Sequence, residues 1–214
     1  MKIGPKYKIC RRLGDNVFPQ CQTTKFSISG SNTKAKGGGK SGGRGGKGGA
    51  RGKSDYGVQL IEKQKARYTY GVNERQFRNY VESARHKVKT GNPAPQLYQL
   101  LERRLDNVVF RAGWASSRAF GRQVVSHGHI LVNGKRVTIP SLTVGLGDVV
   151  TIRKQSLTKP LYSNLDERLK DYVTPKWLLW NEANKTLAVK ALPVFGEQEA
   201  NLNFNAILEF YSRV

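Results

Sequence analysis

The stretch SHGHILVNGKRV at residues 126–137 decides the fold prediction. Within it, Asn133 and Gly134 separate two short strand-like runs. Asn-Gly between such runs is the strongest short signal for a β-hairpin, because both positions of its tight turn need positive φ angles. The run GDVVTIR at 147–153 adds a strand, and helical spacing at about 116–128 predicts a helix directly before the hairpin. A short helical pair is therefore expected to lead into a small, mostly antiparallel sheet.

Helices dominate the region upstream of this sheet. Ser54 caps a first predicted helix, which ends at Gly71. Asn73 with Gln76 three residues later resembles a capping box and begins a second helix. Apolar residues at helical spacing predict a third, continuous helix across 97–109.

Downstream of the sheet, residues 177–192 predict another hairpin and residues 205–214 a terminal helix. The predicted fold class is α+β and α-rich, with a basic flexible N-terminal arm, a helical domain, and a small module made of a helix pair and an antiparallel sheet. The expected boundaries are 1–53 for the arm, 54–100 for the helical domain, completed by about 175–214, and 101–174 for the module.

Charge is the most unusual property of the composition. The chain holds 37 Lys and Arg against 15 Asp and Glu, which gives a formal net charge of +22 and a pI near 10.3. Such an excess repels itself in an isolated protein but suits a polyanion, where each cation displaces condensed counterions. The sequence contains neither a membrane-spanning apolar stretch nor the apolar run of a signal peptide in its first ten residues. Nucleic acid is therefore the expected partner, and no membrane is.

Residues 30–53 form a basic segment with eleven glycines, seven cations and no acid. Because glycine makes ordering costly and there is nothing to bury, the segment is expected to be disordered when free. Its GGGKS at 37–41 is not a nucleotide-binding loop, since that motif needs glycine at the position of Lys34. A solvated linker is the alternative interpretation, but unbalanced cations favour an arm that binds a polyanion.

The two cysteines, Cys10 and Cys21, suit a reducing compartment and are expected to pack as small apolar residues without forming a disulfide framework. A zinc site needs about four ligands at short spacing. No histidine precedes His86, so no metal or cofactor is predicted.

Helix and hairpin together gather the side chains that carry chemistry. Guanidinium groups match phosphate oxygens, and imidazoles hydrogen-bond phosphate or stack on bases. An ordinary solvated helix face is the alternative. Zinc lacks a third nearby ligand, and general-base catalysis lacks a paired nucleophile. The residues concerned are Arg118, Arg122, His127, His129, Lys135 and Arg136.

Residues 117–137, SRAFGRQVVSHGHILVNGKRV, closely resemble the RNA-binding module named after bacterial ribosomal protein S4. Related modules are appended to pseudouridine synthases, tyrosyl-tRNA synthetases and ribosome-rescue factors. Blocks at 54–81 and 100–115 and the ending LEFYSRV resemble the S4 ribosomal protein family itself, almost continuously from residue 53 onward. The N-terminus departs from the family, because many members carry a four-cysteine zinc site where only Cys10 and Cys21 occur here.

The resemblance implies a structural, non-enzymatic component of the small ribosomal subunit. Such a protein binds small-subunit ribosomal RNA directly, nucleates assembly, borders the channel through which mRNA enters, and contributes to translational accuracy. The implied partners are that RNA, the mRNA, and ribosomal proteins S3 and S5, on cytoplasmic ribosomes or, alternatively, organellar ones. The competing interpretations are an RNA-modifying enzyme, and a rescue factor or regulator, each carrying the same module.

The resemblance also supplies candidate RNA-binding residues. In the module they are Arg104, Asn107, Arg111, Ser117, Arg118, Arg122, Gln123, His127, His129, Lys135 and Arg136. In the helical domain they are Tyr56, Lys63, Lys65, Arg67, Tyr70, Arg75, Gln76 and Arg78, and in the arm, from its composition and its place in the family, Arg44, Lys47, Arg51 and Lys53.

Overall fold

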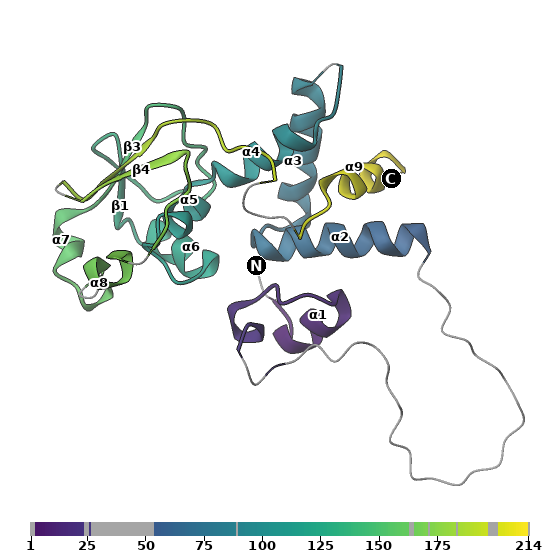
Figure 1. The fold of residues 1–214 in the computed structure, drawn as a ribbon, viewed down its shortest axis with the longest axis horizontal. Helices are drawn as coiled ribbons and strands as arrows, with labels where there is room; N and C mark the ends of the chain where they lie inside the picture. The colour runs from purple at the N-terminus through teal and green to yellow at the C-terminus, as the bar shows by residue number, and fades with distance from the viewer. Residues whose placement is uncertain are drawn as a thin grey trace, which may run out of the picture.

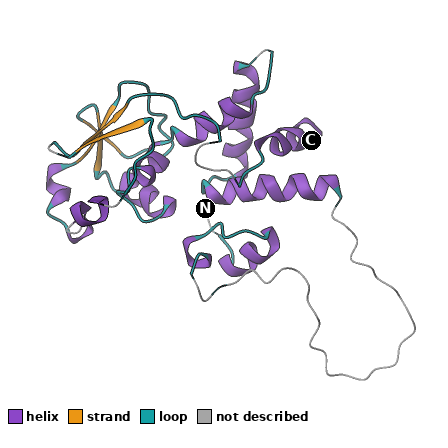
Figure 2. Cartoon of the chain, viewed as in Figure 1, coloured by secondary structure: helices purple, strands orange, loops and turns teal. Residues whose placement is uncertain are grey.

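A computed structural model gives the α+β, α-rich fold that the sequence predicts. Figure 1 shows a sheet at one end of the molecule, helices α2, α3 and α9 toward the other, and α4 and α5 between them. The same division of strands and helices appears in Figure 2. The structure describes residues 3–23, 26, 54–88, 90–162, 165–170, 172–182, 184–196 and 201–213.

The helical part consists of α2 (Asp55–Thr69), α3 (Glu74–Lys87), α4 (Ala94–Glu102) and α9 (Phe204–Arg213). Its core includes the fully buried side chains of Phe77, Leu97 and Ile207. Both predicted caps are present: the Ser54 side chain accepts a hydrogen bond from the Gly57 amide at 3.3 Å, and the Asn73 side chain accepts one from the Gln76 amide at 2.8 Å. The terminal helix packs against α2, so the two ends of this part meet.

The second part packs a helix pair, α5 (Leu105–Arg111) and α6 (Arg118–Ser126), against a five-stranded antiparallel sheet. Its strands are β1 (Ile130–Val132), β2 (Lys135–Val137), β3 (Val149–Ile152), β4 (Leu178–Asn181) and β5 (Thr186–Val189), in the order β2-β1-β3-β5-β4.

The hairpin predicted at Asn133-Gly134 is confirmed. Strands β1 and β2 pair Val132 with Lys135, so two residues form the turn. Both have positive φ, 50° at Asn133 and 78° at Gly134, as a type I′ turn requires. The Asn133 side chain also donates to an Asp148 carboxylate oxygen at 2.8 Å, which ties the turn to the loop before β3.

The prediction of one continuous helix across 97–109 is wrong. The chain leaves the helix at Arg103 and is extended at Arg104, where φ is −65° and ψ is 136°, before α5 begins. Arg104 forms an isolated β-bridge with Thr143, and the Arg103 carbonyl accepts a hydrogen bond from the Val144 amide at 2.9 Å. Backbone pairing with a distant loop outweighs the helical pattern here.

The sequence assigned the whole segment from about residue 175 onward to the helical domain. In the structure, only its last part, with α9, packs there. The second predicted hairpin exists as β4 and β5, but these strands extend the sheet of the module. Trp177, Leu178 and Leu187 are buried in the module core. Three short helices between β3 and β4 were not predicted: α7 (Lys154–Leu157), η2 (Pro160–Tyr162) and α8 (Leu165–Lys170).

Part of the arm predicted over 1–53 is folded, because residues 3–23 include α1 (Lys6–Leu13) and η1 (Pro19–Cys21). Gly14, at a φ of 69°, ends α1 and turns the chain back. The fold brings Cys10 and Cys21 together, fully buried and joined as a disulfide, so the prediction that they form none is wrong. Phe18 packs beside them and meets the Tyr68 ring of α2 edge-on at 5.8 Å.

A close approach between α5 and α6 yields a test of the module core. A Cβ at Gly121 would lie 2.7 Å from the Asp106 carbonyl oxygen. Helix propensity alone predicts that Gly121→Ala stabilises by about 1 kcal/mol. We expect instead a loss of about 1–3 kcal/mol in unfolding free energy, because backbone must move. Urea unfolding measures it, with Ala119→Gly on the exposed side of α6 as control, which should cost about 1 kcal/mol. A stabilised Gly121→Ala variant would contradict the helix packing.

Candidate nucleic-acid interface

A buried carboxylate, Glu102, organises the region where the helical part meets the module. It ends α4 and has no exposed surface. Arg111 of α5 contacts both carboxylate oxygens at 2.9 Å, Asn107 donates to one at 2.9 Å, and the Tyr70 hydroxyl donates to the other at 2.8 Å. The Arg118 guanidinium lies 4.0 Å away. We call these five residues the Glu102 network.

Several predicted RNA-binding residues thus point inward. Asn107 and Tyr70 are 2% and 3% exposed, and the Arg104 side chain is fully buried, paired with Asp106 at 2.6 Å and with the Tyr80 hydroxyl at 2.7 Å. That these three residues touch RNA stays a prediction, and their side chains have almost no exposed surface to offer a ligand. Their polar groups support the surface from within.

The arginine pair on α6 is not a freely exposed pair. The Arg118 Nε donates to the Asn107 side-chain oxygen at 2.7 Å, and its guanidinium lies 4.6 Å from the Phe110 ring centroid. The Arg122 Nη1 donates to the Gly71 carbonyl at 3.3 Å and is partly covered. Ser117 caps α6 by accepting from the Phe120 amide at 3.2 Å.

Cations predicted on α2 are similarly engaged. Lys63 is 6% exposed, bonds Glu74 at 2.7 Å, and lies 4.7 Å from the Phe210 ring centroid. Lys65 pairs with Glu62 at 2.8 Å, and Arg67 lies 3.6 Å from Glu74. Lys63 and Arg67 tie α2 to α3, and Lys63 also contacts α9, whereas the Lys65 pair lies within α2. Little of these side chains is left for a ligand.

Another group of predicted residues lies open on the surface. Gln76 is half-buried, and Arg78 pairs with Glu82 while staying exposed. The exposed members are Tyr56, Arg75, Arg78, Gln123, His127, Lys135 and Arg136. The residues Arg44, Lys47, Arg51 and Lys53 lie outside the described residues.

Cationic groups from separate elements converge at the end of α6. His127 and His129 have ring centroids 6.1 Å apart, and the Arg136 guanidinium reaches from β2 to the His127 carbonyl at 3.4 Å. Arg153 donates its backbone amide to the His129 carbonyl at 2.8 Å. With the exposed Lys159 these four residues make up what we call the His129 cluster.

The electrostatic environment of the His129 cluster is positive. The pKa of His129 lies below its usual value, first because the ring is partly buried, and then because Lys159, His127, Arg136 and Arg153 repel a proton there. The neutral ring is held by a 2.9 Å hydrogen bond between its Nδ1 and the Ser156 hydroxyl. The repulsion from these neighbouring side chains, unlike the burial, indicates a surface that favours an anion.

Sequence reasoning missed three contributors to this region. Arg153 and Lys159 follow β3, where the pattern was used only to place a strand. The sequence did contain a signal for Arg153, because a cation that directly follows a strand paired with the hairpin lies at the same edge of the sheet. The role of Glu102 was missed because, in the sequence, an acidic residue within a predicted amphipathic helix is expected to face solvent.

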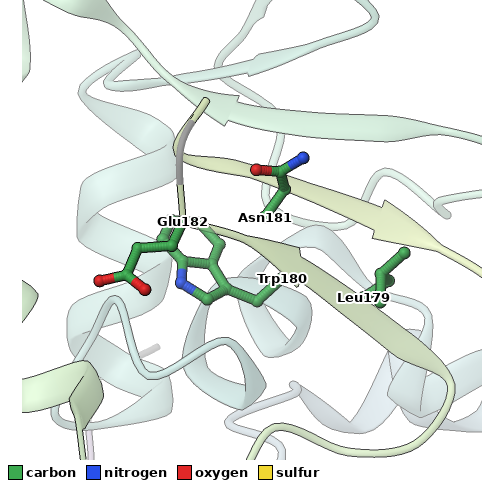
Figure 3. A pocket seen from close by; sticks show the side chains of 4 residues that line it. All are labelled: Leu179, Trp180, Asn181 and Glu182. Atoms are coloured by element: carbon green, nitrogen blue, oxygen red, sulfur yellow. The ribbon is translucent and has the colours of Figure 1, made fainter.

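A hollow on the edge of the sheet offers less to a polyanion. Figure 3 shows an open hollow on the edge strand β4, lined by Leu179, Trp180, Asn181 and Glu182. It presents a carboxylate and no cation. Across the described ranges, no group of three or more His, Cys, Asp and Glu side chains could hold a metal ion. None of the helices there has the length and apolarity to cross a bilayer.

Comparison with known proteins agrees with this geometry. Residues 1–102 match the family described as the ribosomal protein S4/S9 N-terminal domain, and residues 103–150 match the S4 domain. Proteins named small ribosomal subunit protein uS4 from Roseiflexus sp. (strain RS-1) and Chloroflexus aurantiacus are each 44% identical, over 212 and 213 residues. The aligned regions span 98% and 99% of this chain and 98% of each relative.

Because of the Glu102 network, we expect the free energy of unfolding to fall when the pH becomes acidic. Burial raises the pKa of the Glu102 carboxyl, but the bonds and charges of Arg111, Arg118 and Tyr70 outweigh it, so its pKa lies below the ordinary 4.5. Its stabilising effect is therefore complete above about pH 4.5 and is lost as pH falls through the lowered value. Glu102→Gln should lower the free energy of unfolding by about 3 kcal/mol near pH 7. On acidification, the unfolding free energy of this variant should fall less than that of the parent protein. Denaturant unfolding from pH 7 to 3 measures both, and parallel pH profiles would contradict this assignment.

Proposed function

The chain belongs to the S4 family of ribosomal proteins, and from that premise we propose that it binds small-subunit ribosomal RNA directly, as a structural and non-enzymatic part of the small ribosomal subunit. The observation that carries the proposal is the His129 cluster, in which Arg136 of β2 and Arg153 and Lys159 after β3 gather around the two histidines that follow α6. Like charges gather at a cost unless a polyanion neutralises them.

The contacts that we propose follow from exposure. His127, Lys135 and Arg136 would bind phosphate oxygens or bases together with Arg153 and Lys159, and Arg122 and Gln123 extend this surface along α6. On the helical part, the proposed contacts are the exposed side chains of Tyr56, Arg75 and Arg78, together with the half-buried Gln76. Lys63, Lys65, Arg67, Arg111, Ser117 and Arg118 would act chiefly by shaping these surfaces.

We further propose an organisation and a wider role. Two folded bodies, the helical part with α9 and the module with β4 and β5, would each present one RNA-binding surface. Initiation of subunit assembly, a place beside the channel through which mRNA enters, contacts with S3 and S5, and an influence on translational accuracy rest on the family resemblance. The basic segment with Arg44, Lys47, Arg51 and Lys53 would extend the RNA contacts.

The proposal predicts a steep, site-specific salt dependence. Binding of a transcript of the 5′ domain of bacterial small-subunit ribosomal RNA should weaken as salt rises, with a log–log slope of about −0.7 to −0.9 per phosphate neutralised. Lys135→Ala with Arg136→Ala should reduce the steepness by roughly one to two units and cost about 1.5–3 kcal/mol for each lost charge-assisted bond.

Lys87→Ala is the control, because Lys87 is also exposed but ends α3, on the helical part. Filter binding at several salt concentrations gives the slopes, and thermal unfolding verifies that the variants fold. Equal slopes for the double variant and the control would remove the His129 cluster from the interface, and no salt dependence at all would remove the proposed function.

A further inference from the structure

Two folded bodies meet around one carboxylate. Glu102 is the last residue of α4, and the next two residues, Arg103 and Arg104, leave the helix before α5 begins. A non-helical connection of this kind does not by itself fix the angle between the helices on either side. Backbone pairing ties the connection to the loop near Thr143, and side-chain contacts between the two parts help to set how the helical part lies against the module.

Resting on the RNA binding proposed above, we propose that Glu102 is a positioning residue that holds the two RNA-facing bodies in one orientation, so that both surfaces engage one folded RNA together. Its carboxylate is contacted from the end of α2 by Tyr70 and from α5 by Asn107 and Arg111. These contacts come from both sides of the connection, and each has a defined direction.

The network ties further elements to the same point. Arg118 of α6 bonds Asn107 at 2.7 Å and lies 5.0 Å from the Tyr70 ring centroid, so the module's second helix touches the helical part as well. Beside it, Arg122 bonds the Gly71 carbonyl directly after α2. A second tie crosses nearby, from Tyr80 of α3 to Arg104.

The buried carboxylate contributes more to a fixed orientation of the two bodies than to the net stability of the protein. A buried ion pair contributes little net stability compared with apolar packing, but its hydrogen bonds accept only a narrow range of geometries. Apolar surfaces in contact slide more easily than a carboxylate held by four donors. A protein with two RNA surfaces gains from such rigidity, because slack between them lowers the effective concentration of the second surface.

The charge change and the loss of positioning act in opposite directions, which makes the proposal testable. Glu102→Gln removes a negative charge, so electrostatics alone would strengthen RNA binding. Loss of a fixed orientation weakens it, and we expect at least a ~10-fold increase in Kd. Glu209→Gln is the charge control: it makes the same charge change at a carboxylate that accepts a 2.8 Å bond from Gln59, but within the helical part.

Two readouts decide the matter on the full-length protein. Backbone residual dipolar couplings report whether one alignment tensor fits both bodies, and titration with the 5′-domain transcript gives Kd. The couplings of the parent protein and of Glu209→Gln should each fit one tensor. The Kd values of these two proteins should agree within twofold. Glu102→Gln should need two tensors of different magnitude and bind ~10-fold more weakly.

A second variant covers the case in which Glu102→Gln does not fold. Tyr70→Phe keeps the charge and the ring but removes the only bond from α2 to the carboxylate that the described contacts show. It should change the couplings in the same direction and raise Kd by a smaller factor. One shared tensor in every folded variant overturns the positioning role, and separate tensors with unchanged Kd overturn its link to RNA. If the parent protein itself fails to bind the transcript, the proposed function falls while the couplings still test the positioning.

Discussion

The ion pair between Glu102 and Arg111 is the constraint on which the rest of the structure depends. A carboxylate without exposed surface must be neutralised and hydrogen-bonded, or it would take up a proton. Arg111, Asn107 and Tyr70 meet that demand, and in doing so they set where α5 and the end of α2 lie. The surfaces that face outward inherit their positions from this buried requirement.

Local patterns were enough for much of the fold. The turn at Asn133 and Gly134 follows from the φ angles that these two residues accept, and the caps at Ser54 and Asn73 follow from side chains that satisfy free amides. What failed depends on contacts distant in sequence. The break after Glu102 is set by pairing with residues near Thr143, and β4 and β5 join β3 across more than twenty residues.

The candidate site was predictable as a region but not residue by residue. Net charge identifies a polyanion as partner, yet it says nothing about which cations are consumed inside the protein. Arg104 and Lys63 look like exposed cations in the sequence, and each is neutralised internally by a carboxylate. Since a cation's availability depends on where the acids fold, the exposed part of the positive charge can be counted only after the fold is known.

Backbone and charge are coupled most closely at Gly128. Its φ of 71° ends α6 and turns the chain into β1, a conformation that disfavours residues with a side chain. A Cβ there would also collide with the Arg136 guanidinium, which crosses this point to reach the His127 carbonyl. The same missing side chain thus stops the helix and makes room for a cation from the hairpin. Because the turn that forms the fold also brings Arg136 to the His129 cluster, the charged surface cannot be separated from the architecture that displays it.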